Sequence, residues 1–589
     1  MMDTIKSFKG YGKVDPVEEQ AFRKRTRKRL IILIVSLVVL VGVIIGAVVG
    51  VVEHKGKSSS DSAPSSGLTP SASLKAVCSV TLYPSSCFSS IASQAGAFNT
   101  TDPEMFFKLS LRVAVNEMSK LLEIPSQLME KTDDAQVKAA LTVCETVFDD
   151  AVDRLNDSLS SMEVAEGEKL LSSSKIDDMK TWLSASITDQ EACLDALNEL
   201  NSTHYGNSSI LEDIKTAMEN STQFVSNSLA IGTKIVTLLS EVNVPIHRRL
   251  LGFQRSDSSG LPRWVSAGDR RLLQEINPTP NVTVAADGTG NFTTIKDAVN
   301  AVPKKSPTRF VIYIKKGNYT ENVTLDKNRW NVMMYGDGTA ETIVSGSLNF
   351  VDGTPTFSTA TVAVTGKGFM ARDMAFVNTA GPVKHQAVAF RSGSDQSVFY
   401  RCRFDAYQDT LYAHSNRQFY KDCDITGTID FIFGNAAVVF QNCTILPRQP
   451  LAYQFNTITA QGKTDPNQNT GISIQKCTFV PLDTTLIAPT YLGRPWKEYS
   501  TTVIMESEIG SFLQPAGWIG WVSNVDPPNT IFYAEYQNNG PGANTDRRVK
   551  WAGYKSTLTD AEAGKFTVGT FIQGNEWLPE TTVTFEQGL

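Results

Sequence analysis

The sequence predicts a chain of three parts: an N-terminal transmembrane segment, an all-α four-helix bundle and a right-handed parallel β-helix. Three observations lead to this prediction. Residues 30–52 carry no charge, apolar residues recur at helical spacing through residues 76–240, and a strand-like unit returns about every twenty residues beyond residue 277. The chain has 589 residues, which is too many for one ordinary domain.

The uncharged run is long enough to span a bilayer. It follows a basic cluster, Arg23–Arg29, which predicts a cytosolic basic tail over residues 1–29 and a signal anchor over residues 30–52. The alternative is a long signal peptide that is cleaved. Both interpretations send the rest of the chain into the secretory pathway.

Two further features agree with a secretory chain. The eight cysteines all lie beyond residue 70, where disulfides can form. Asn-x-Ser/Thr sequons predict a glycoprotein. The sequons begin at Asn99, Asn156, Asn201, Asn207, Asn220, Asn281, Asn291, Asn318, Asn322 and Asn442.

Residues 53–75 are rich in Ser, Gly and Pro and are predicted to form a flexible stalk. Through residues 76–240 the apolar spacing is three and four, with few Pro or Gly, which predicts a bundle of amphipathic helices. Nothing in this region resembles a catalytic motif. Its four cysteines allow three pairings, which spacing leaves open. They are Cys78, Cys87, Cys144 and Cys193.

Residues 241–276 read as a linker that contains the same four residues twice. A dibasic pair in an exposed secretory linker is a candidate site for a processing protease, and the alternative is an incidental pair of charges. The two copies are Arg248-Arg249-Leu250-Leu251 and Arg270-Arg271-Leu272-Leu273.

From residue 277 onward, short β-branched and aromatic runs alternate with Gly, Asn and Asp. The unit Phe399–Phe404 returns at Phe419–Ile425 and at Val439–Ile445, with a looser copy at Ile474–Phe479. One strand per repeat without intervening helices favours a parallel β-helix over a leucine-rich horseshoe. The repeated cysteines would then stack on one inward-facing ladder.

The repeat also places two carboxylates. Asp409 and Asp430 each follow a repeat cysteine by seven residues. They should therefore occupy equivalent positions on adjacent coils, about 4.8 Å apart. Two acids at this distance cannot both ionise freely, so the pKa of one should rise, which divides the pair into an acid and a base or nucleophile. The alternative is two turn aspartates that cap their own backbone.

The neighbouring motifs support a reactive pair. Gln408 precedes Asp409, and Gln386 lies 22 residues earlier, so two amides could donate hydrogen bonds to an oxyanion. Arg494 and Trp496 follow in Tyr491–Trp496, where an Arg could hold one carboxylate and a Trp could stack on a sugar ring. A surface Arg and a packed Trp are the alternative.

Composition excludes several classes of protein. Residues 1–30 carry a net charge of +5, residues 31–280 carry −10 and residues 281–589 carry −1, so no extended basic face exists for nucleic acid. The five histidines show no metal-ligand spacing, and we expect no metal and no cofactor. No Gly-x-Ser-x-Gly elbow is present.

The motifs resemble those of the plant pectin methylesterase family over residues 277–587. The resemblance rests on the segments quoted above together with Val284–Phe292, Gly317–Glu321 and Gln514–Trp521, all in family order. The helical residues 76–235 are similar to the pectin methylesterase inhibitor domain, mainly through four cysteine positions. The resemblance implies a catalytic domain over residues 277–589 with a right-handed parallel β-helix, preceded by an inhibitor-like pro-domain.

The resemblance also implies roles for the site residues. Asp430 would be the nucleophile on the C6 methyl ester, Asp409 the acid and then the base, and Gln386 and Gln408 the oxyanion donors. Arg494 would hold Asp430, and Trp496 and Thr356 would contact the sugar. The implied disulfides are Cys78–Cys87, Cys144–Cys193 and Cys423–Cys443, which leaves Cys402 and Cys477 free.

The expected partners are methyl-esterified pectin, a processing protease, the chain's own inhibitor-like domain and, before processing, a membrane through residues 30–52. The precursor is expected in secretory membranes and the mature enzyme in the cell wall. Two rival functions are a glycoside hydrolase on the same solenoid, because paired carboxylates also suit that reaction, and a non-catalytic inhibitor or wall-binding protein.

Overall fold

The computed structural model describes residues 69–163, 171–201, 208–241 and 278–589. Residues 70–521 and 526–589 form one compact unit. The predicted basic tail, the signal anchor at residues 30–52 and both Arg-Arg-Leu-Leu sites lie outside the described residues. Within the described part of the chain, no helix is long and apolar enough to cross a membrane.

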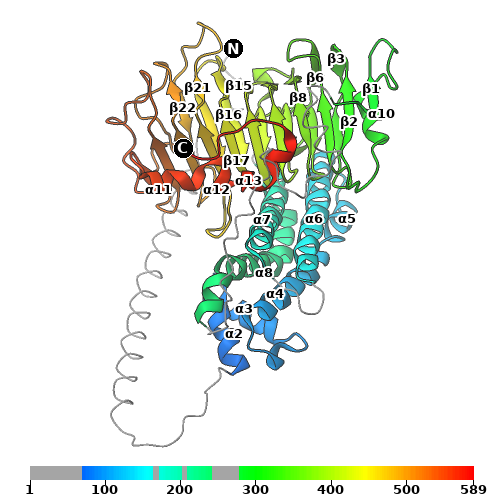
Figure 1. The fold of residues 1–589 in the computed structure, drawn as a ribbon, viewed down its shortest axis with the longest axis vertical. Helices are drawn as coiled ribbons and strands as arrows, with labels where there is room; N and C mark the ends of the chain where they lie inside the picture. The colour runs from blue at the N-terminus through cyan, green and yellow to red at the C-terminus, as the bar shows by residue number, and fades with distance from the viewer. Residues whose placement is uncertain (1–68, 164–170, 202–207, 242–277) are drawn as a thin grey trace, which may run out of the picture. The chain divides into compact units, whose positions relative to one another are not determined.

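The helical region is built on four long helices, which bear out the predicted bundle (Figure 1). They are α4 (Pro103–Ser119), α6 (Ala135–Ser161), α7 (Ser173–Asn201) and α8 (Ser208–Glu241). Shorter helices are α2 (Pro70–Cys78), α3 (Pro84–Ala92) and α5 (Ile124–Met129). Aspartates cap two of the long helices: Asp102 accepts from Glu104 N on α4, and Asp134 accepts from Gln136 N on α6.

One predicted boundary is wrong. Residues 70–75, which the composition assigned to the stalk, belong to helix α2. Pro70 suits the first turn of a helix because its φ is already helical and its missing N–H needs no partner. Leu74 and Val77 are fully buried in the helical core, so packing overrides the flexible composition.

Both predicted disulfides of the helical region are confirmed. Cys78–Cys87 joins α2 to α3, and Cys144–Cys193 joins α6 to α7. All four sulfurs belong to the buried core. Each bridge joins one helix to the next along the chain, and it favours the bundle by restricting the unfolded chain.

The remaining residues wind into a parallel β-helix with three sheets, as the repeat predicts. Its eleven-stranded sheet contains β1 (Val282–Val284), β2 (Phe310–Ile314), β5 (Val332–Tyr335), β8 (Met370–Arg372), β11 (Ser397–Tyr400), β14 (Arg417–Lys421), β17 (Ala437–Gln441), β20 (Gly471–Gln475), β23 (Thr501–Met505), β25 (Phe532–Tyr536) and β26 (Tyr554–Lys555).

The seven-stranded sheet contains β4 (Val323–Leu325), β7 (Val362–Val364), β10 (Phe390–Ser392), β13 (Leu411–Ala413), β16 (Ile429–Gly434), β19 (Asn456–Gln461) and β22 (Thr490–Gly493). The eight-stranded sheet contains β3 (Gly317–Thr320), β6 (Thr342–Gly346), β9 (Ala375–Asn378), β12 (Arg403–Asp405), β15 (Asp424–Gly427), β18 (Thr444–Pro447), β21 (Thr478–Phe479) and β24 (Glu508–Ile509).

Short helices complete this region. They are α10 (Ile295–Asn300), α11 (Asp560–Ala563), α12 (Val568–Phe571) and α13 (Gly574–Trp577). The C-terminal helices lie along the eleven-stranded sheet (Figure 1), where Val568 and Trp577 share an apolar cluster with Phe419. This sheet face is therefore closed by the chain itself.

Side chains inside the coils stack from one coil to the next. Phe399 lies 4.4 Å from Tyr420, centroid to centroid, and Tyr420 lies 4.6 Å from Phe440. The residue before each repeat cysteine turns the chain through positive φ, at 51° for Arg401 and 55° for Asp422. These corners keep successive coils in register, so equal positions in the repeat become neighbours in space.

The predicted Cys423–Cys443 disulfide is wrong, because both thiols are free and buried, as are Cys402 and Cys477. The sulfurs of Cys423 and Cys443 each contact a backbone carbonyl of the preceding coil instead. Cys423 Sγ donates to Phe399 O at 3.4 Å, and Cys443 Sγ donates to Tyr420 O at 3.5 Å. The inward ladder predicted for the cysteines is therefore a ladder of thiols.

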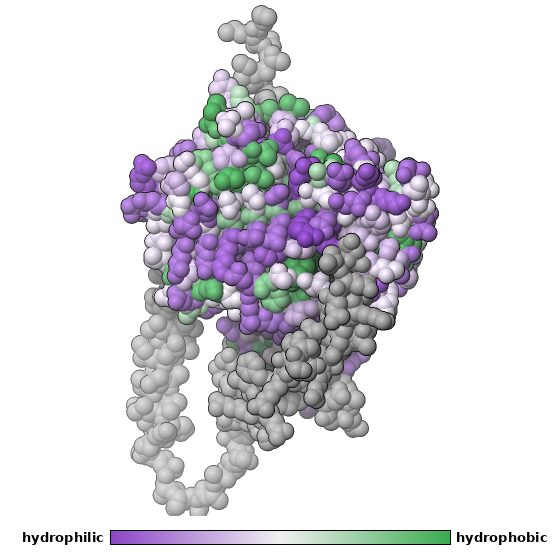
Figure 2. All heavy atoms as spheres, turned by 45° about the horizontal axis from the view of Figure 1, so that its top comes forward, coloured by the Kyte–Doolittle hydropathy of each residue, from purple (hydrophilic) through white to green (hydrophobic). Residues whose placement is uncertain are grey.

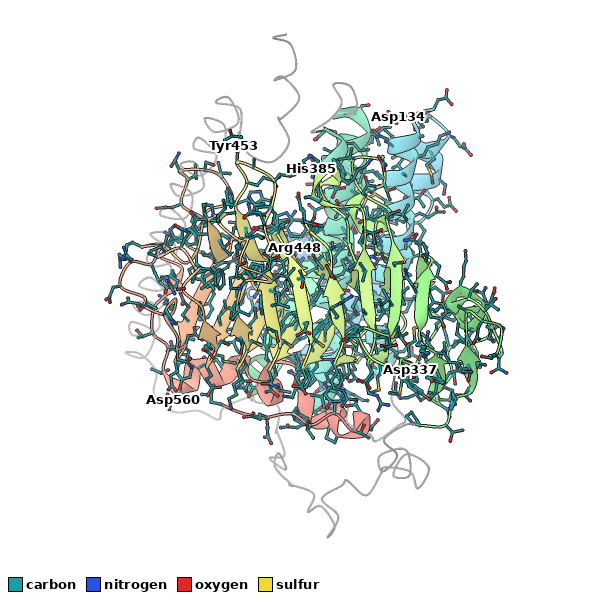
Figure 3. All side chains as sticks on the ribbon, turned by 90° about the horizontal axis from the view of Figure 1, so that it is seen from above. Asp134, Asp337, His385, Arg448, Tyr453 and Asp560 are labelled. Carbon is teal, nitrogen blue, oxygen red and sulfur yellow. A yellow bond between two sulfur atoms is a disulfide. The ribbon has the colours of Figure 1, made fainter. Side chains whose placement is uncertain are left out.

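The face of the described residues seen in Figure 2 is largely hydrophilic, with separate apolar patches. Loops project at the edges of the β-helix. In Figure 3, His385 and Tyr453 lie at one edge, and Asp337 and Asp560 lie at the opposite edge. The loop of His385 leads directly into Gln386, so this edge borders the predicted site.

Candidate active site

Register brings the two predicted aspartates together. Strand β13 pairs with β16 through Leu411↔Ile432, and Asp409 and Asp430 each lie two residues before these partners. Asp409 N donates to Ile429 O at 3.0 Å, which fixes the coil at this point. Both aspartates adopt positive φ, at 63° and 51°, a conformation that non-glycine residues seldom take. The spacing argument thus predicted their placement correctly.

A dense set of donors holds Asp430. Arg494 donates from Nε to Oδ1 at 2.9 Å and from Nη2 to Oδ2 at 2.7 Å. Thr457 Oγ1 donates to Oδ1 at 2.6 Å. Arg494 and Asp430 are 6% and 5% exposed, so this is a buried, bidentate, charge-assisted pair. It fixes the orientation of the carboxylate.

Asp409 has a different environment, because no cation of the described residues is bonded to it. Burial raises the pKa of Asp409 well above its usual range, and the charges of Asp430 and Glu199 raise it further, while Arg494 opposes them. A carboxyl group in this environment holds its proton at a pH where an ordinary aspartate is ionised. The two acids are therefore inequivalent.

The two glutamines stack as the repeat predicts. Gln386 and Gln408 form a parallel bridge, in which Ala387 N donates to Gln408 O at 3.2 Å. Both side chains are buried, and Gln408 is next to Asp409 in the chain. Two amide groups are thereby held on adjacent coils beside the aspartates.

Aromatic rings form a wall next to Arg494, which we call the aromatic wall: Phe433, Trp496 and Trp521. Trp496 lies 6.2 Å from Phe433 and 6.3 Å from Trp521, centroid to centroid. The Arg494 guanidinium lies 4.2 Å from the Trp521 ring centroid. A side chain at Gly462 would come within 2.8 Å of Trp496, so glycine is needed there.

Thr356 lies at the start of a short 3₁₀ turn, Thr356–Ser358, ahead of β7. Its backbone N donates to Glu199 Oε2 on helix α7 at 3.0 Å. Burial raises the pKa of Glu199 to about 7. In the full chain, Thr356, which is predicted to contact the sugar, is thus bonded to a carboxylate of the helical region.

The helices cover the face of the seven-stranded sheet. Phe357, Tyr412 and Phe433 join the apolar cluster of the helical core. Polar contacts surround this cluster, among them Asn435 Nδ2 to Thr188 Oγ1 at 2.9 Å. An ion pair joins Arg417 to Asp178 at 2.8 Å. The aspartate pair lies on this covered side of the β-helix.

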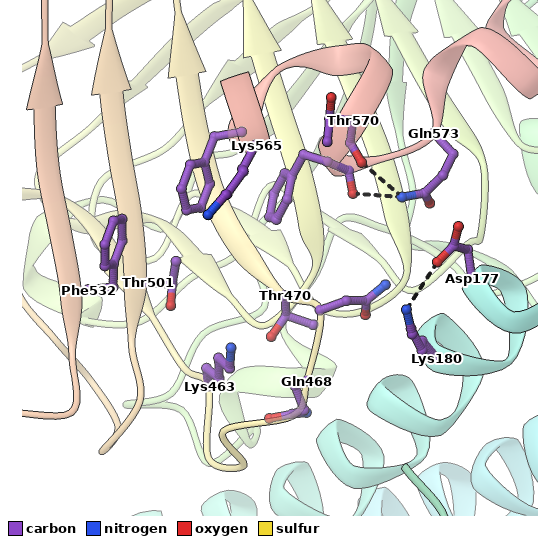
Figure 4. A pocket seen from close by; sticks show the side chains of 13 residues that line it. Asp177, Lys180, Lys463, Gln468, Thr470, Thr501, Phe532, Lys565, Thr570 and Gln573 are labelled. Carbon is purple, nitrogen blue, oxygen red and sulfur yellow. Dashed lines mark hydrogen bonds and ion pairs between the residues drawn. The ribbon is translucent and has the colours of Figure 1, made fainter. Parts of the chain in front are cut away.

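A separate cavity of about 430 Å³ lies where α7 meets the loop after β19 and the C-terminal helices (Figure 4). Its lining includes Lys180, Lys463 and Lys565, and Asp177 pairs with Lys180. Burial lowers the pKa of Lys463 to about 8. Residues of both regions line this cavity, and neither catalytic candidate does.

Sequence reasoning missed Thr457 and the acids of α7. Thr457 lies 27 residues after Asp430, beyond the twenty-residue period, and the pairing of β16 with β19 shifts register between Ile429 and Ile432. The acidic contacts join residues more than 150 positions apart, such as Glu199 and Thr356. No spacing rule could have found them.

Comparison with known proteins identifies both regions. Residues 281–575 match the family Pectinesterase, and residues 72–231 match the plant invertase/pectin methylesterase inhibitor family. The chain is 63% identical to "Pectinesterase 3" of Phaseolus vulgaris over 100% of both chains. It is 58% identical to "Pectinesterase 1" of Arabidopsis thaliana over 99% of both.

Among solved structures, the pectin methylesterase from carrot is 54% identical, with a TM-score of 0.52. The match covers 54% of this chain and 100% of the carrot chain. That share is about what residues 278–589 make up, so the carrot enzyme is a stable structure of this length without a helical region. The chain therefore belongs to the plant pectinesterase family, with an inhibitor-type domain ahead of the enzyme, and is a carboxylic ester hydrolase that de-esterifies pectin in the cell wall.

Proposed function

We propose that Asp430 is the nucleophile of this pectin methylesterase and that Asp409 is its acid and base. The observation that carries the proposal is the contrast between the two acids. Arg494 holds the Asp430 carboxylate with two of its nitrogens, whereas burial and the neighbouring charge raise the pKa of Asp409. Environments that separate two acids in this way assign them different roles.

In the first step, an Asp430 oxygen attacks the C6 carbonyl of a methyl-esterified galacturonate. The carbonyl electrons move onto its oxygen, and Gln386 and Gln408 donate hydrogen bonds to that oxyanion. The tetrahedral intermediate collapses with loss of methoxide, which takes the Asp409 proton and leaves as methanol. An acyl-enzyme on Asp430 remains.

In the second step, Asp409 is a carboxylate and accepts a proton from water. The resulting hydroxide attacks the acyl carbonyl, the bond to Asp430 breaks, and the product acid loses its proton to solvent and leaves as a free uronate. Asp409 then carries the proton again for the next turnover. Trp496 and Thr356 would contact the sugar ring during both steps.

Arg494→Lys tests the proposal, because lysine keeps the charge but loses the planar fork. We expect kcat for methanol release to fall by about 100-fold or more, since a misplaced nucleophile loses its attack geometry. The matched control is Arg548→Lys, which alters a similar buried pair with Glu535 elsewhere in the β-helix. Parent-like kcat in folded Arg494→Lys would contradict the assignment.

The contacts of helix α7 support a second proposal, that the helical region silences the enzyme in the precursor. Thr356 N donates a hydrogen bond to Glu199, and the helical core covers the sheet face that carries the aspartates. A tethered module acts at an effective concentration of about millimolar, so even weak docking would suppress activity. Cleavage after Leu273 would release a mature enzyme beginning near Gln274 from a membrane-anchored precursor, with Leu251 as a secondary site.

A further inference from the structure

Lys497 carries the further inference. It lies in the catalytic region, three residues after Arg494, and its ammonium faces two acids of helix α7. Lys497 Nζ is 2.5 Å from Asp195 Oδ1 and 3.5 Å from Glu191 Oε2. Among the residues that the structure describes, both ion-pair partners of Lys497 thus belong to the helical region. A released enzyme would present this cation without either of them.

The side chain also belongs to the site. Lys497 Nζ lies 5.1 Å from the ring centroid of Trp496, a member of the aromatic wall. Its backbone is held in place, because Lys497 N donates to Ser500 Oγ at 3.0 Å. A fixed cation beside an aromatic face suits an anionic sugar, whose ring stacks while its carboxylate meets the ammonium.

The acids of α7 indicate how far Lys497 lies from the reacting ester. Glu191, Asp195 and Glu199 are spaced by four residues and share one helix face. Glu199 reaches the catalytic centre, since it accepts from Thr356 N and its charge raises the pKa of Asp409. Asp195 lies one turn away, about 6 Å along the axis. This is the scale that separates neighbouring rings of a sugar chain.

We infer that Lys497 binds the free carboxylate of the uronate unit adjacent to the unit whose ester is cleaved. In the full chain, acidic side chains of α7 are bonded to Lys497 where that carboxylate would bind. The inference rests on the proposed function, because it needs the ester to lie at Asp409 and Asp430. Lys497 is thus a specificity-determining residue for the same reaction.

The consequence concerns the order in which esters are removed. A methyl ester is neutral and offers the ammonium only an acceptor, whereas a carboxylate offers an opposite charge. Each turnover converts an ester into a carboxylate, so each product unit becomes a binding group for the next cleavage. The released enzyme would therefore work in runs of adjacent units.

The test uses the catalytic region, residues 274–589, on two pectins: one fully methyl-esterified and one about half de-esterified at random by alkali. The readout is the ratio of kcat/KM per ester on the second substrate to that on the first. Lys497→Ala should lower this ratio by about fivefold, as expected for one partly exposed charge-assisted contact. Lys497→Arg, which keeps the charge, should retain most of the ratio.

Lys550→Ala is the matched control, because Lys550 is exposed and its Nζ donates to Asp546 O on the last coils. Its ratio should equal that of the parent. An equal loss of kcat/KM on both pectins in folded Lys497→Ala would overturn the inference, as would an unchanged ratio. Activity of Asp430→Asn reports separately on the proposed function, so the two failures are distinguishable.

Discussion

Two sets of carboxylates meet at the covered face of the β-helix, and they differ in what holds them. Asp430 is bonded to Arg494 and Thr457 of its own β-helix. Glu199 and Asp195, on helix α7, are bonded to Thr356 and Lys497 of the other region. Asp430 is buried, whereas Glu199 and Asp195 are partly exposed. The partners of the reactive acid belong to its own region and remain after cleavage. The partners of a docking acid belong to the other region and are lost when the two regions separate.

The largest effect on activity is expected from removing the charge of Asp430, the nucleophile of the reactive set. Asp430→Asn in residues 274–589 keeps the shape but loses the attacking oxygen, so methanol release should fall by about 10⁴-fold or more. The variant should still fold, with a lower melting temperature because the buried Arg494 loses its counter-ion. Activity within about tenfold of the parent would mean that Asp430 is not the nucleophile.

The next test keeps the docking set in place. Replacing Arg248, Arg249, Arg270 and Arg271 by Ala should leave the two regions joined, and full-length protein should be retained inside the cell. Its specific activity should be about 100-fold below that of residues 274–589, because a tethered module docks at high effective concentration. Normal secretion of a product of the mature size would contradict processing at these sites.

A smaller effect should follow from pH. The pKa of Glu199 is raised to about 7 in the docked state, against an ordinary value of 4.5. Between these values the docked state binds the extra proton, so docking weakens as pH rises through this window. Methanol release by the uncleaved chain, relative to residues 274–589, should rise by about tenfold from pH 5 to pH 7.5.

Glu199→Gln should flatten that pH dependence, since the amide does not titrate. Glu117→Gln is the matched control, because Glu117 pairs with Lys120 within the helical region. A relative activity that falls with pH, or the same slope in Glu199→Gln, would show that another group governs docking.

The repeat let the sequence predict the β-helix and the reactive set. In a solenoid, sequence spacing converts directly into spatial neighbourhood. Asp409 and Asp430 could therefore be placed from their distance to the repeat cysteines, and Gln386 from its distance to Gln408. Thr457 was not predicted as a site residue because the chain between β16 and β19 departs from the period of about twenty residues. Asp195 was not predicted because it contacts Lys497, 302 residues away, and only tertiary packing determines such a contact.

The cysteines also show where sequence spacing stops predicting contacts. Cys78–Cys87 and Cys144–Cys193 are confirmed, whereas Cys423 and Cys443 are free. Neighbouring coils bring these thiols close, but their backbone carbonyls already satisfy them. Proximity on a ladder therefore does not specify a bond. The membrane segment and the processing sites remain predictions from the sequence.

The protonation state of Asp409 tests the division of the reactive pair most directly. Infrared difference spectra of the full-length chain, parent minus Asp409→Asn, would report the protonated carboxyl stretch of this side chain. Because burial and the charge of Asp430 raise its pKa well above 3.8, the band should persist at pH 6. A band that disappears by pH 5, as for an ordinary aspartate, would contradict the assignment of Asp409 as the acid.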